Sequence, residues 1–153
     1  MEIRLALPSD VDALVEFNQA MALETEGKQL DAATLRAGVS AVFGDAKKGF
    51  YVVVEEKDTV AAGLMVTTEW SDWRNGWFWW IQSVYVRPEH RGGGLYGRMY
   101  DFVKTRAAES GDVCGFRLYV EKENERAQHV YEKLGMERTY YLMYEEETKN
   151  RSL

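Results

Sequence analysis

The segment that most constrains the fold of this chain is residues 84–97, which read VYVRPEHRGGGLYG. An apolar run from Val84 to Val86 leads into a proline, and three consecutive glycines follow at positions 92–94. Apolar residues spaced three and four apart begin directly after these glycines, which is typical of an amphipathic helix. The segment therefore predicts a strand that turns through a glycine loop into a helix.

The glycine loop also has the composition of an anion site. Glycine has no Cβ, so the N–H groups of such a loop can point at one spot without obstruction. The helix that follows adds a partial positive charge at its N-terminus, and Arg91 adds a guanidinium with a planar fork of donors. Phosphate is the anion that suits this arrangement best. A tight turn without a ligand is the alternative interpretation.

Two nucleotide-binding motifs compete for the same glycines. Gly92, Gly94 and Gly97 match the G-x-G-x-x-G spacing of dinucleotide-binding folds. That motif normally follows a first parallel strand and is embedded in repeated βαβ units, whereas here it follows a predicted meander and little chain remains. A phosphate-binding P-loop does not fit either, because no Gly-Lys-Ser/Thr follows.

The second patterned segment is residues 124–136, which read NERAQHVYEKLGM. Ala127, Tyr131 and Leu134 share one face of a helix, and Asn124 begins that face one turn earlier. Asn124 suits the N-cap, and Gly135 suits a left-handed cap that returns the chain to a strand. Tyr131 is either a core tyrosine or a general acid.

Together the two segments resemble the GNAT acetyltransferase superfamily. The acyl-CoA-binding signature of that family, Arg/Gln-x-x-Gly-x-Gly/Ala, falls on Arg91, Gly94 and Tyr96, with Tyr96 in place of the usual small residue. A second family pattern, Asn-x-x-Ala-x-x-x-Tyr-x-x-x-Gly-Phe/Met, matches at Asn124, Ala127, Tyr131, Gly135 and Met136. The resemblance implies the acyl-CoA N-acyltransferase fold, an α/β domain with a mixed, mainly antiparallel central sheet flanked by helices. The sheet is expected to splay between the strand ending at Val86 and a strand over 115–121.

The resemblance further implies acetyl-CoA, or another acyl-CoA, as donor. The residues expected to bind this co-substrate are Val84, Tyr85, Val86, Arg91, Gly92, Gly93, Gly94, Leu95, Tyr96, Gly97, Asn124 and Ala127. The splay is expected to leave backbone groups of 81–86 for the pantetheine chain, and an N–H near Val84 or Tyr85 to polarise the thioester carbonyl. Tyr131 is expected to protonate the leaving thiolate.

The expected acceptor is a primary amine of a small molecule or peptide, which attacks the thioester directly. Glu24 and Glu26 are candidate bases, because the loop after the first helix lines the acceptor pocket in GNAT-like folds; a solvated acidic turn is the alternative. The residues expected to contact the acceptor are Asp72, Trp73, Trp80 and Gln82. A non-catalytic acyl-CoA sensor or interaction domain is the competing function. A dimerisation protein without small-molecule function is a third.

Composition argues against some classes of function and cellular location. The 153 residues predict one domain over 1–153, and the formal net charge of −6 argues against nucleic-acid binding. The only cysteine, Cys114, excludes an internal disulfide and favours a cytoplasmic location. The sequence shows neither a signal peptide nor a run of ~20 apolar residues, so no membrane is expected as partner. Two histidines and one cysteine give no readable metal cluster.

The remaining pattern predicts the order of elements. Pro8-Ser9-Asp10 is expected to start the first helix, which ends at Gly27, and Asn75-Gly76 is expected to form a hairpin turn. Four aromatic residues at 77–80 indicate a core strand or a homodimer interface. The predicted strands are 2–7, 50–55, 59–69, 77–86, 115–121 and 137–146, and the further helices are 31–43, one directly after the glycines, and 123–134.

Overall fold

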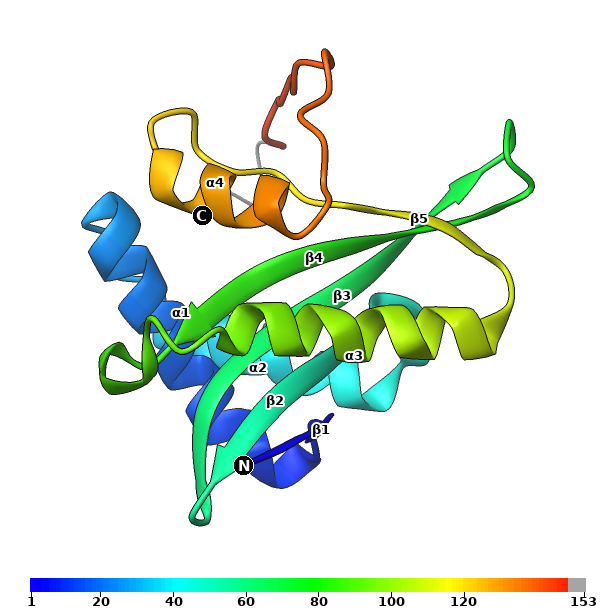
Figure 1. Ribbon diagram of the computed structural model, residues 1–153. Helices are drawn as coiled ribbons and strands as arrows, with labels where there is room; N and C mark the ends of the chain where they lie inside the picture. Colours follow the sequence, from blue (N-terminus) through cyan, green and yellow to red (C-terminus); the bar gives the residue numbers. More distant parts are fainter. Residues whose placement is uncertain (149–153) are drawn as a thin grey trace. The chain divides into compact units, whose positions relative to one another are not determined.

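The computed structural model describes residues 1–148. Contacts divide the chain into two units, the first spanning Met1–Leu118 and the second beginning at Tyr119. The first unit contains a five-stranded sheet in the spatial order β1-β2-β3-β4-β5 (Figure 1). The strands span Glu2–Leu5, Phe50–Glu56, Thr59–Ser71, Gly76–Val86 and Val113–Arg117. Strands β1 to β4 pair antiparallel and β5 pairs parallel to β4, so the mixed, mainly antiparallel sheet is confirmed.

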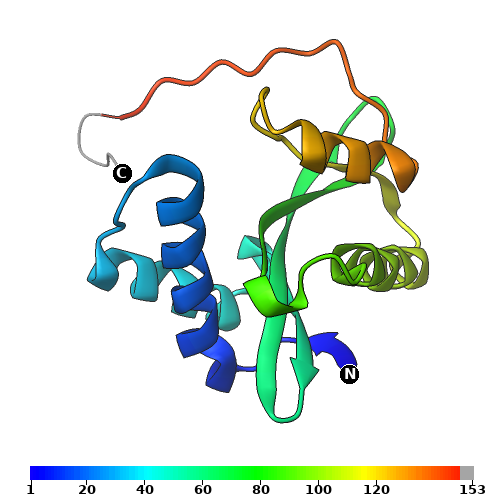
Figure 2. The same ribbon diagram turned by 60° about the vertical axis from the view of Figure 1, so that its left-hand side comes forward.

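Three helices of the first unit cover the two faces of this sheet. Helices α1 (Val11–Glu26) and α2 (Ala32–Gly44) lie on one face, and α3 (Leu95–Ser110) lies on the other (Figure 2). Leu14 and Phe17 of α1 pack in one core cluster with Val53 of β2. On the opposite face, Tyr100 of α3 meets Phe116 of β5 edge to face.

Local signals explain where these elements begin and end. Helix α1 follows the 3-10 turn Pro8–Asp10 and stops at Gly27, whose φ of 62° is the left-handed cap that the sequence predicts. Asp31 caps α2 by accepting a hydrogen bond from the Thr34 N–H at 2.9 Å. Strand β2 is covered on both faces, which is why its sequence is an unbroken apolar run rather than an alternating one.

Strands β3 and β4 form the long hairpin that the Asn-Gly pair predicts. Ser71 pairs with Gly76 at its tip, and Asn75 takes a left-handed φ of 48°. Further along, Gly63 pairs with Tyr85 whereas Met65 pairs with Gln82, so β4 carries one extra residue. This β-bulge includes Ser83, whose φ of 51° is uncommon for a residue with a side chain.

The sheet splays where the sequence predicts. Pairing between β4 and β5 ends at Trp80 and Arg117, while β4 continues to Val86. The predicted bounds of β5 were wrong, because the strand runs from Val113 to Arg117 rather than over 115–121. The strand ends where its pairing with β4 ends, and sequence alternation does not record where two strands separate.

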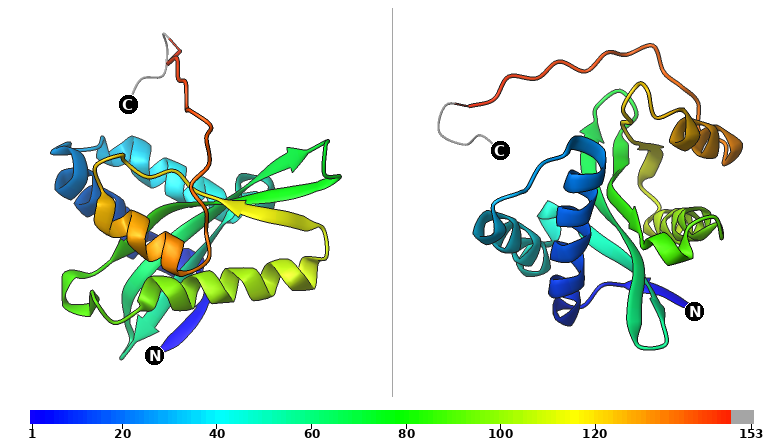
Figure 3. Two further views of the ribbon diagram at one scale, coloured as in Figure 1. Left: turned by 45° about the horizontal axis from the view of Figure 1, so that its top comes forward. Right: turned by 90° about the vertical axis from the view of Figure 1, so that its left-hand side faces the viewer.

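The second unit contains helix α4, Glu125–Lys133. Asn124 caps it by accepting from the Ala127 N–H at 3.1 Å, and Gly135 follows the helix with a φ of 101°. The predicted strand over 137–146 is wrong, because these residues form no strand within the described range (Figure 3). Their apolar side chains are exposed, with Tyr144 at 91%, and a strand pattern needs a neighbouring backbone to pair with.

Candidate functional site

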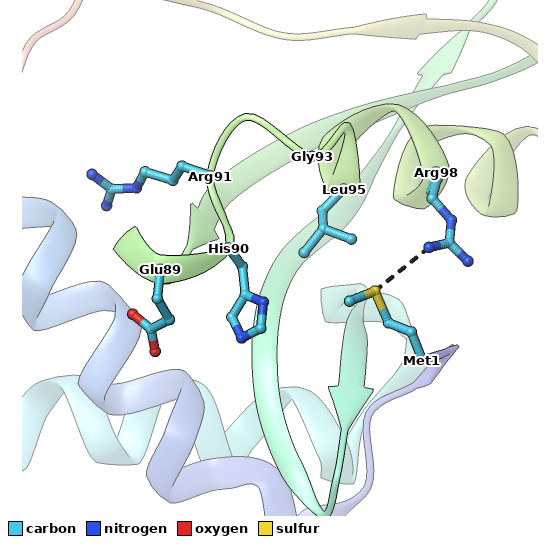
Figure 4. Close-up of a pocket in the computed structure, with 7 residues that line it drawn as sticks. All are labelled: Met1, Glu89, His90, Arg91, Gly93, Leu95 and Arg98. Atoms are coloured by element: carbon cyan, nitrogen blue, oxygen red, sulfur yellow. Dashed lines mark hydrogen bonds between the residues drawn. The ribbon is translucent and has the colours of Figure 1, made fainter.

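A short 3-10 turn, Pro88–His90, connects β4 to the glycine loop of residues 92–94, and α3 begins directly after the loop (Figure 4). Gly92 and Gly94 have φ values of 83° and 78°, a backbone conformation that other residues rarely adopt. A Cβ built at either position would meet no atom within 4 Å. The glycines are therefore required by the backbone conformation, and the space above them stays open to a ligand.

The N-terminus of α3 presents donors toward that space. Gly94 is the N-cap and supplies no side-chain cap. The first backbone bond of the helix runs from the Arg98 N–H to the Gly94 carbonyl at 3.2 Å, so the N–H groups of Leu95 and Gly97 have no partner inside the helix. Such donors, together with the helix dipole, suit a phosphate oxygen.

A pocket of about 300 Å³ lies beside the loop (Figure 4). Its lining residues come from the chain start, the 3-10 turn, the glycine loop and α3: Met1, Glu89, His90, Arg91, Gly93, Leu95 and Arg98. Arg98 Nη1 lies 3.5 Å from Met1 Sδ, and His90 Nδ1 lies 3.3 Å from Glu56 Oε2. Sequence reasoning did not select Arg98 or His90, since neither falls in a motif.

The Arg91 side chain extends away from Met1 and Arg98 and meets the end of α1 (Figure 4). Its Nη2 donates to Glu24 Oε2 at 2.9 Å, and its Nε donates to the Val86 carbonyl at 2.9 Å. The Tyr85 hydroxyl donates to Glu24 Oε1 at 3.2 Å. Burial and then the Glu24 charge raise the pKa of the Tyr85 hydroxyl, which keeps it protonated as a donor. The structure thus joins Glu24, Tyr85 and Arg91 in one cluster.

The part of β4 beyond Trp80 is the free edge of the splay. Strand β5 contributes no partner to residues 81–86 within the described chain, so backbone groups of this stretch are available to a ligand on this side, except the Val86 carbonyl, which accepts from Arg91 Nε. The bulge at Ser83 redirects the backbone in the middle of this edge, and bulges often occur beside active sites. No sequence signal predicted the bulge, because serine is not a residue type that marks a positive φ.

The acceptor candidates on β4 lie on the α1 and α2 face of the sheet, the face that also carries Tyr85. Gln82 Nε2 donates to Thr67 Oγ1 at 2.6 Å, and Trp80 Nε1 donates to Glu69 Oε1 at 3.0 Å. Arg117 Nη1 meets the same Glu69 carboxylate at 2.9 Å. The motifs did not indicate Glu69 or Arg117, which become neighbours only through strand pairing.

Asp72, Trp73 and the candidate base Glu26 do not lie with Gln82, Tyr85 and Glu24 in the described structure. Asp72 and Trp73 lie in the turn of the β3–β4 hairpin, and Trp73 is 87% exposed. Trp80 instead pairs with Thr67, well inside the hairpin. Glu26, the last residue of α1, is exposed and does not join the cluster of Glu24 with Tyr85 and Arg91.

In the second unit, α4 carries the second motif on a regular helix. Asn124 is its N-cap, and the bond that Asn124 accepts comes from the Ala127 N–H. Burial raises the pKa of the Tyr131 hydroxyl above its usual range. Tyr131 is therefore protonated at neutral pH, as a proton donor must be.

Similarity to known proteins identifies the family of this chain. The model of the Acetyltransferase (GNAT) family matches residues 12–136. The chain belongs to the acetyltransferase (GNAT) family. The match includes both the glycine loop and the motif on α4, so the resemblance read from these segments is confirmed.

Two relatives place this GNAT chain among acyltransferases. A possible acetyltransferase from Clostridium difficile 630 shares 47% identity with a TM-score of 0.89, covering 96% of this chain and 97% of that one. The L-amino acid N-acyltransferase MnaT of Escherichia coli (strain K12) is 29% identical over 143 residues, or 88% of this chain and 78% of that protein. A predicted acetyltransferase from Clostridium acetobutylicum, solved with acetyl-CoA, shares the fold at 20% identity and a TM-score of 0.76, covering 95% of each chain.

No three or more His, Cys, Asp and Glu side chains among residues 1–148 come together in a way that could hold a metal ion. None of the helices within those residues is both long and apolar enough to cross a membrane.

Proposed function

We propose that this chain transfers the acetyl group of acetyl-CoA to the primary amine of a small molecule. The observation that carries the proposal is the junction of β4 with α3, where a helix N-terminus without a side-chain cap follows a strand edge that β5 leaves unpaired. The helix N-terminus suits the pyrophosphate, and the strand edge suits the amide-bearing pantetheine chain. Membership of the GNAT family supports the same co-substrate.

The residues at this junction fit such a co-substrate. The N–H groups of the loop and of the first turn of α3 would bind the pyrophosphate oxygens, and positive φ values at Gly92 and Gly94 leave the approach open. Backbone groups of residues 81–86 would pair with pantetheine, and an N–H near Val84 would polarise the thioester carbonyl. From the motif on α4, Asn124 and Ala127 are also proposed as co-substrate contacts.

In the proposed reaction the acceptor attacks directly, so the protein contributes mainly positioning and proton transfer. A carboxylate, Glu24 or Glu26, takes one proton from the acceptor ammonium. The amine nitrogen then forms a bond to the acetyl carbon as the carbon–sulfur bond breaks. Tyr131 gives its proton to the departing thiolate, and this role rests on the motif that α4 carries. The amide nitrogen then gives up its second proton, which restores the Tyr131 hydroxyl, and the carboxyl group releases its proton to water. The products are an amide and free coenzyme A.

The proposal also names the chemical class of the acceptor amine. The name of the MnaT relative refers to L-amino acids, so amino acids are the first acceptors to test. Trp80 and Gln82 lie on the proposed acceptor face, and Asp72 and Trp73 stay candidates at the hairpin tip. Peptide amines form the second class.

Calorimetry with acetyl-CoA, followed by thiol release across an amine library, tests the proposal. Gly94→Val puts a branched side chain at a φ of 78°, directly at the start of α3. We expect it to weaken acetyl-CoA binding at least tenfold, because loop and helix can no longer direct their N–H groups at one anion. Gly38→Val, in α2, is the control for an added side chain.

Three outcomes separate the candidate functions. Binding with turnover supports the transferase. Binding without turnover on any amine favours the sensor. Equal affinity in wild type and a folded Gly94→Val variant would show that the loop is not the binding site.

A further inference from the structure

The two candidate bases at the end of α1 have different surroundings. Both oxygens of Glu24 accept hydrogen bonds from the protein framework, Oε1 from Tyr85 at 3.2 Å and Oε2 from Arg91 at 2.9 Å. The Glu26 side chain makes no hydrogen bond or ion pair within residues 1–148. Glu24 would have to weaken one of its bonds in order to accept a proton, whereas Glu26 would not.

Arg91 connects Glu24 to the glycine loop. Its Nε donates to the carbonyl of Val86, the last residue of β4, at 2.9 Å. Its guanidinium carbon lies 5.4 Å from the centre of the Tyr85 ring, so the ring borders the group on one side. Three neighbours, the Glu24 carboxylate, the Val86 carbonyl and the Tyr85 ring, therefore fix the residue that directly precedes Gly92.

This anchor matters because the loop has no side chains of its own to pack. The buried side chain of Leu95 fixes the C-terminal end of the glycine loop. Between Arg91 and Leu95 there are only glycines, which have more backbone freedom than any other residue. A ligand that had to order this segment would bind more weakly, while a loop already held in place avoids that cost.

We propose that Glu24 is a positioning residue rather than the base, and that it holds the glycine loop in its anion-binding conformation through Arg91. The inference rests on the proposed function and deepens it. Glu24 then acts on the affinity for acetyl-CoA rather than on proton transfer. It also ties that affinity to the end of α1, next to the loop proposed to line the acceptor pocket.

The test is Glu24→Gln, which keeps the shape of the side chain and removes its charge. Glu24 and Arg91 are both partly exposed, so we expect a moderate effect, with the Kd for acetyl-CoA raised roughly 3- to 10-fold. At saturating acetyl-CoA, kcat should stay within about threefold of wild type, and its decline toward low pH should be retained.

Glu16→Gln is the matched control. Glu16 lies on the same helix and forms an equivalent ion pair, with Arg87 Nη1 at 2.8 Å, but Arg87 lies outside the glycine loop. We expect this variant to bind acetyl-CoA like wild type. A double-mutant cycle adds Arg91→Met: in that background, Glu24→Gln should have no further effect on affinity, because Glu24 acts only through Arg91.

A measurement on the ligand-free protein completes the test. Amide hydrogen exchange of residues 92–95 should be faster in Glu24→Gln than in wild type or Glu16→Gln. Unchanged affinity with a large loss of kcat and of its low-pH decline would overturn the inference and make Glu24 the base. Additive effects in the cycle would overturn it as well. If wild type binds no acetyl-CoA, the proposed function fails, and hydrogen exchange still decides whether Glu24 anchors the loop.

Discussion

At the residue scale, the proposed chemistry depends on groups that must hold a proton until it is needed. Two tyrosines meet this condition. Burial and the Glu24 charge raise the pKa of Tyr85, and burial raises the pKa of Tyr131. The Tyr85 hydroxyl donates a hydrogen bond to Glu24 within the protein, and proton donation by Tyr131 is a prediction from the motif.

Tyr131→Phe tests that assignment, because it keeps the ring and removes only the hydroxyl. If Tyr131 protonates the leaving thiolate, kcat should fall by roughly 10²-fold, while the KM for acetyl-CoA changes little. Because burial raises its pKa, the wild-type rate should persist until the pH exceeds the usual range for a phenol, about 10. Steady-state kinetics against pH measures both effects. Tyr144→Phe, at an exposed position, is the control, and an unchanged kcat in Tyr131→Phe would reduce Tyr131 to a packing residue.

At the element scale, β4 carries Trp80, Gln82 and Tyr85 of the candidate site, and a residue of the neighbouring strand β5 makes room for a β4 side chain. Gly115 of β5 lies opposite Phe78, and a Cβ at Gly115 would meet the Phe78 ring at 2.7 Å. The Arg117 guanidinium lies 3.6 Å from the centre of that ring and pairs with Glu69. The missing side chain of Gly115 thus gives room to a stack that joins β3, β4 and β5.

Gly115→Ala should therefore destabilise the first unit. The added methyl group forces the buried Phe78 ring to move, and overpacking of this kind costs about 1–3 kcal/mol. Urea unfolding measures the change in the free energy of unfolding. Gly38→Ala is the matched control, because a Cβ there meets no atom within 4 Å and alanine favours the interior of a helix. Equal stabilities of the two variants would show that the ring yields without strain.

The same elements show what sequence could and could not predict. The start of α1, its end at Gly27, the Asn75 hairpin turn and the glycine loop were predicted because each depends on a few adjacent residues. The end of β5, the bulge at Ser83 and the loss of a strand over 137–146 were not predictable in this way. Each depends on where segments distant in the sequence pair or separate, and the pairing of Glu69 with Arg117 also arises from strand pairing.

At the scale of the whole molecule, stability should depend on pH through a buried ion network near the chain start. The Asp10 side chain is 7% exposed and meets Arg4 Nη1 at 2.8 Å, while Arg4 Nη2 meets Glu55 at 2.8 Å. Burial by itself would raise the pKa of Asp10, but hydrogen bonds from Arg4 and from the Leu7 N–H hold it below its usual range. The network joins β1, the start of α1 and β2.

Asp10→Asn should lower the free energy of unfolding by about 2–3 kcal/mol at pH 7, because it leaves Arg4 with one partner fewer in a partly buried place. A carboxyl group with a lowered pKa in the folded state stabilises the protein above its unfolded pKa of about 4, and this contribution is lost as the pH falls further. Wild type should therefore lose stability faster than Asp10→Asn below pH ~4, until the two converge. Urea unfolding across this range measures the difference. Asp12→Asn, which breaks an exposed pair with Arg36, should change stability by less than about 1 kcal/mol. Parallel pH curves for wild type and Asp10→Asn would contradict the assignment of this stability to Asp10.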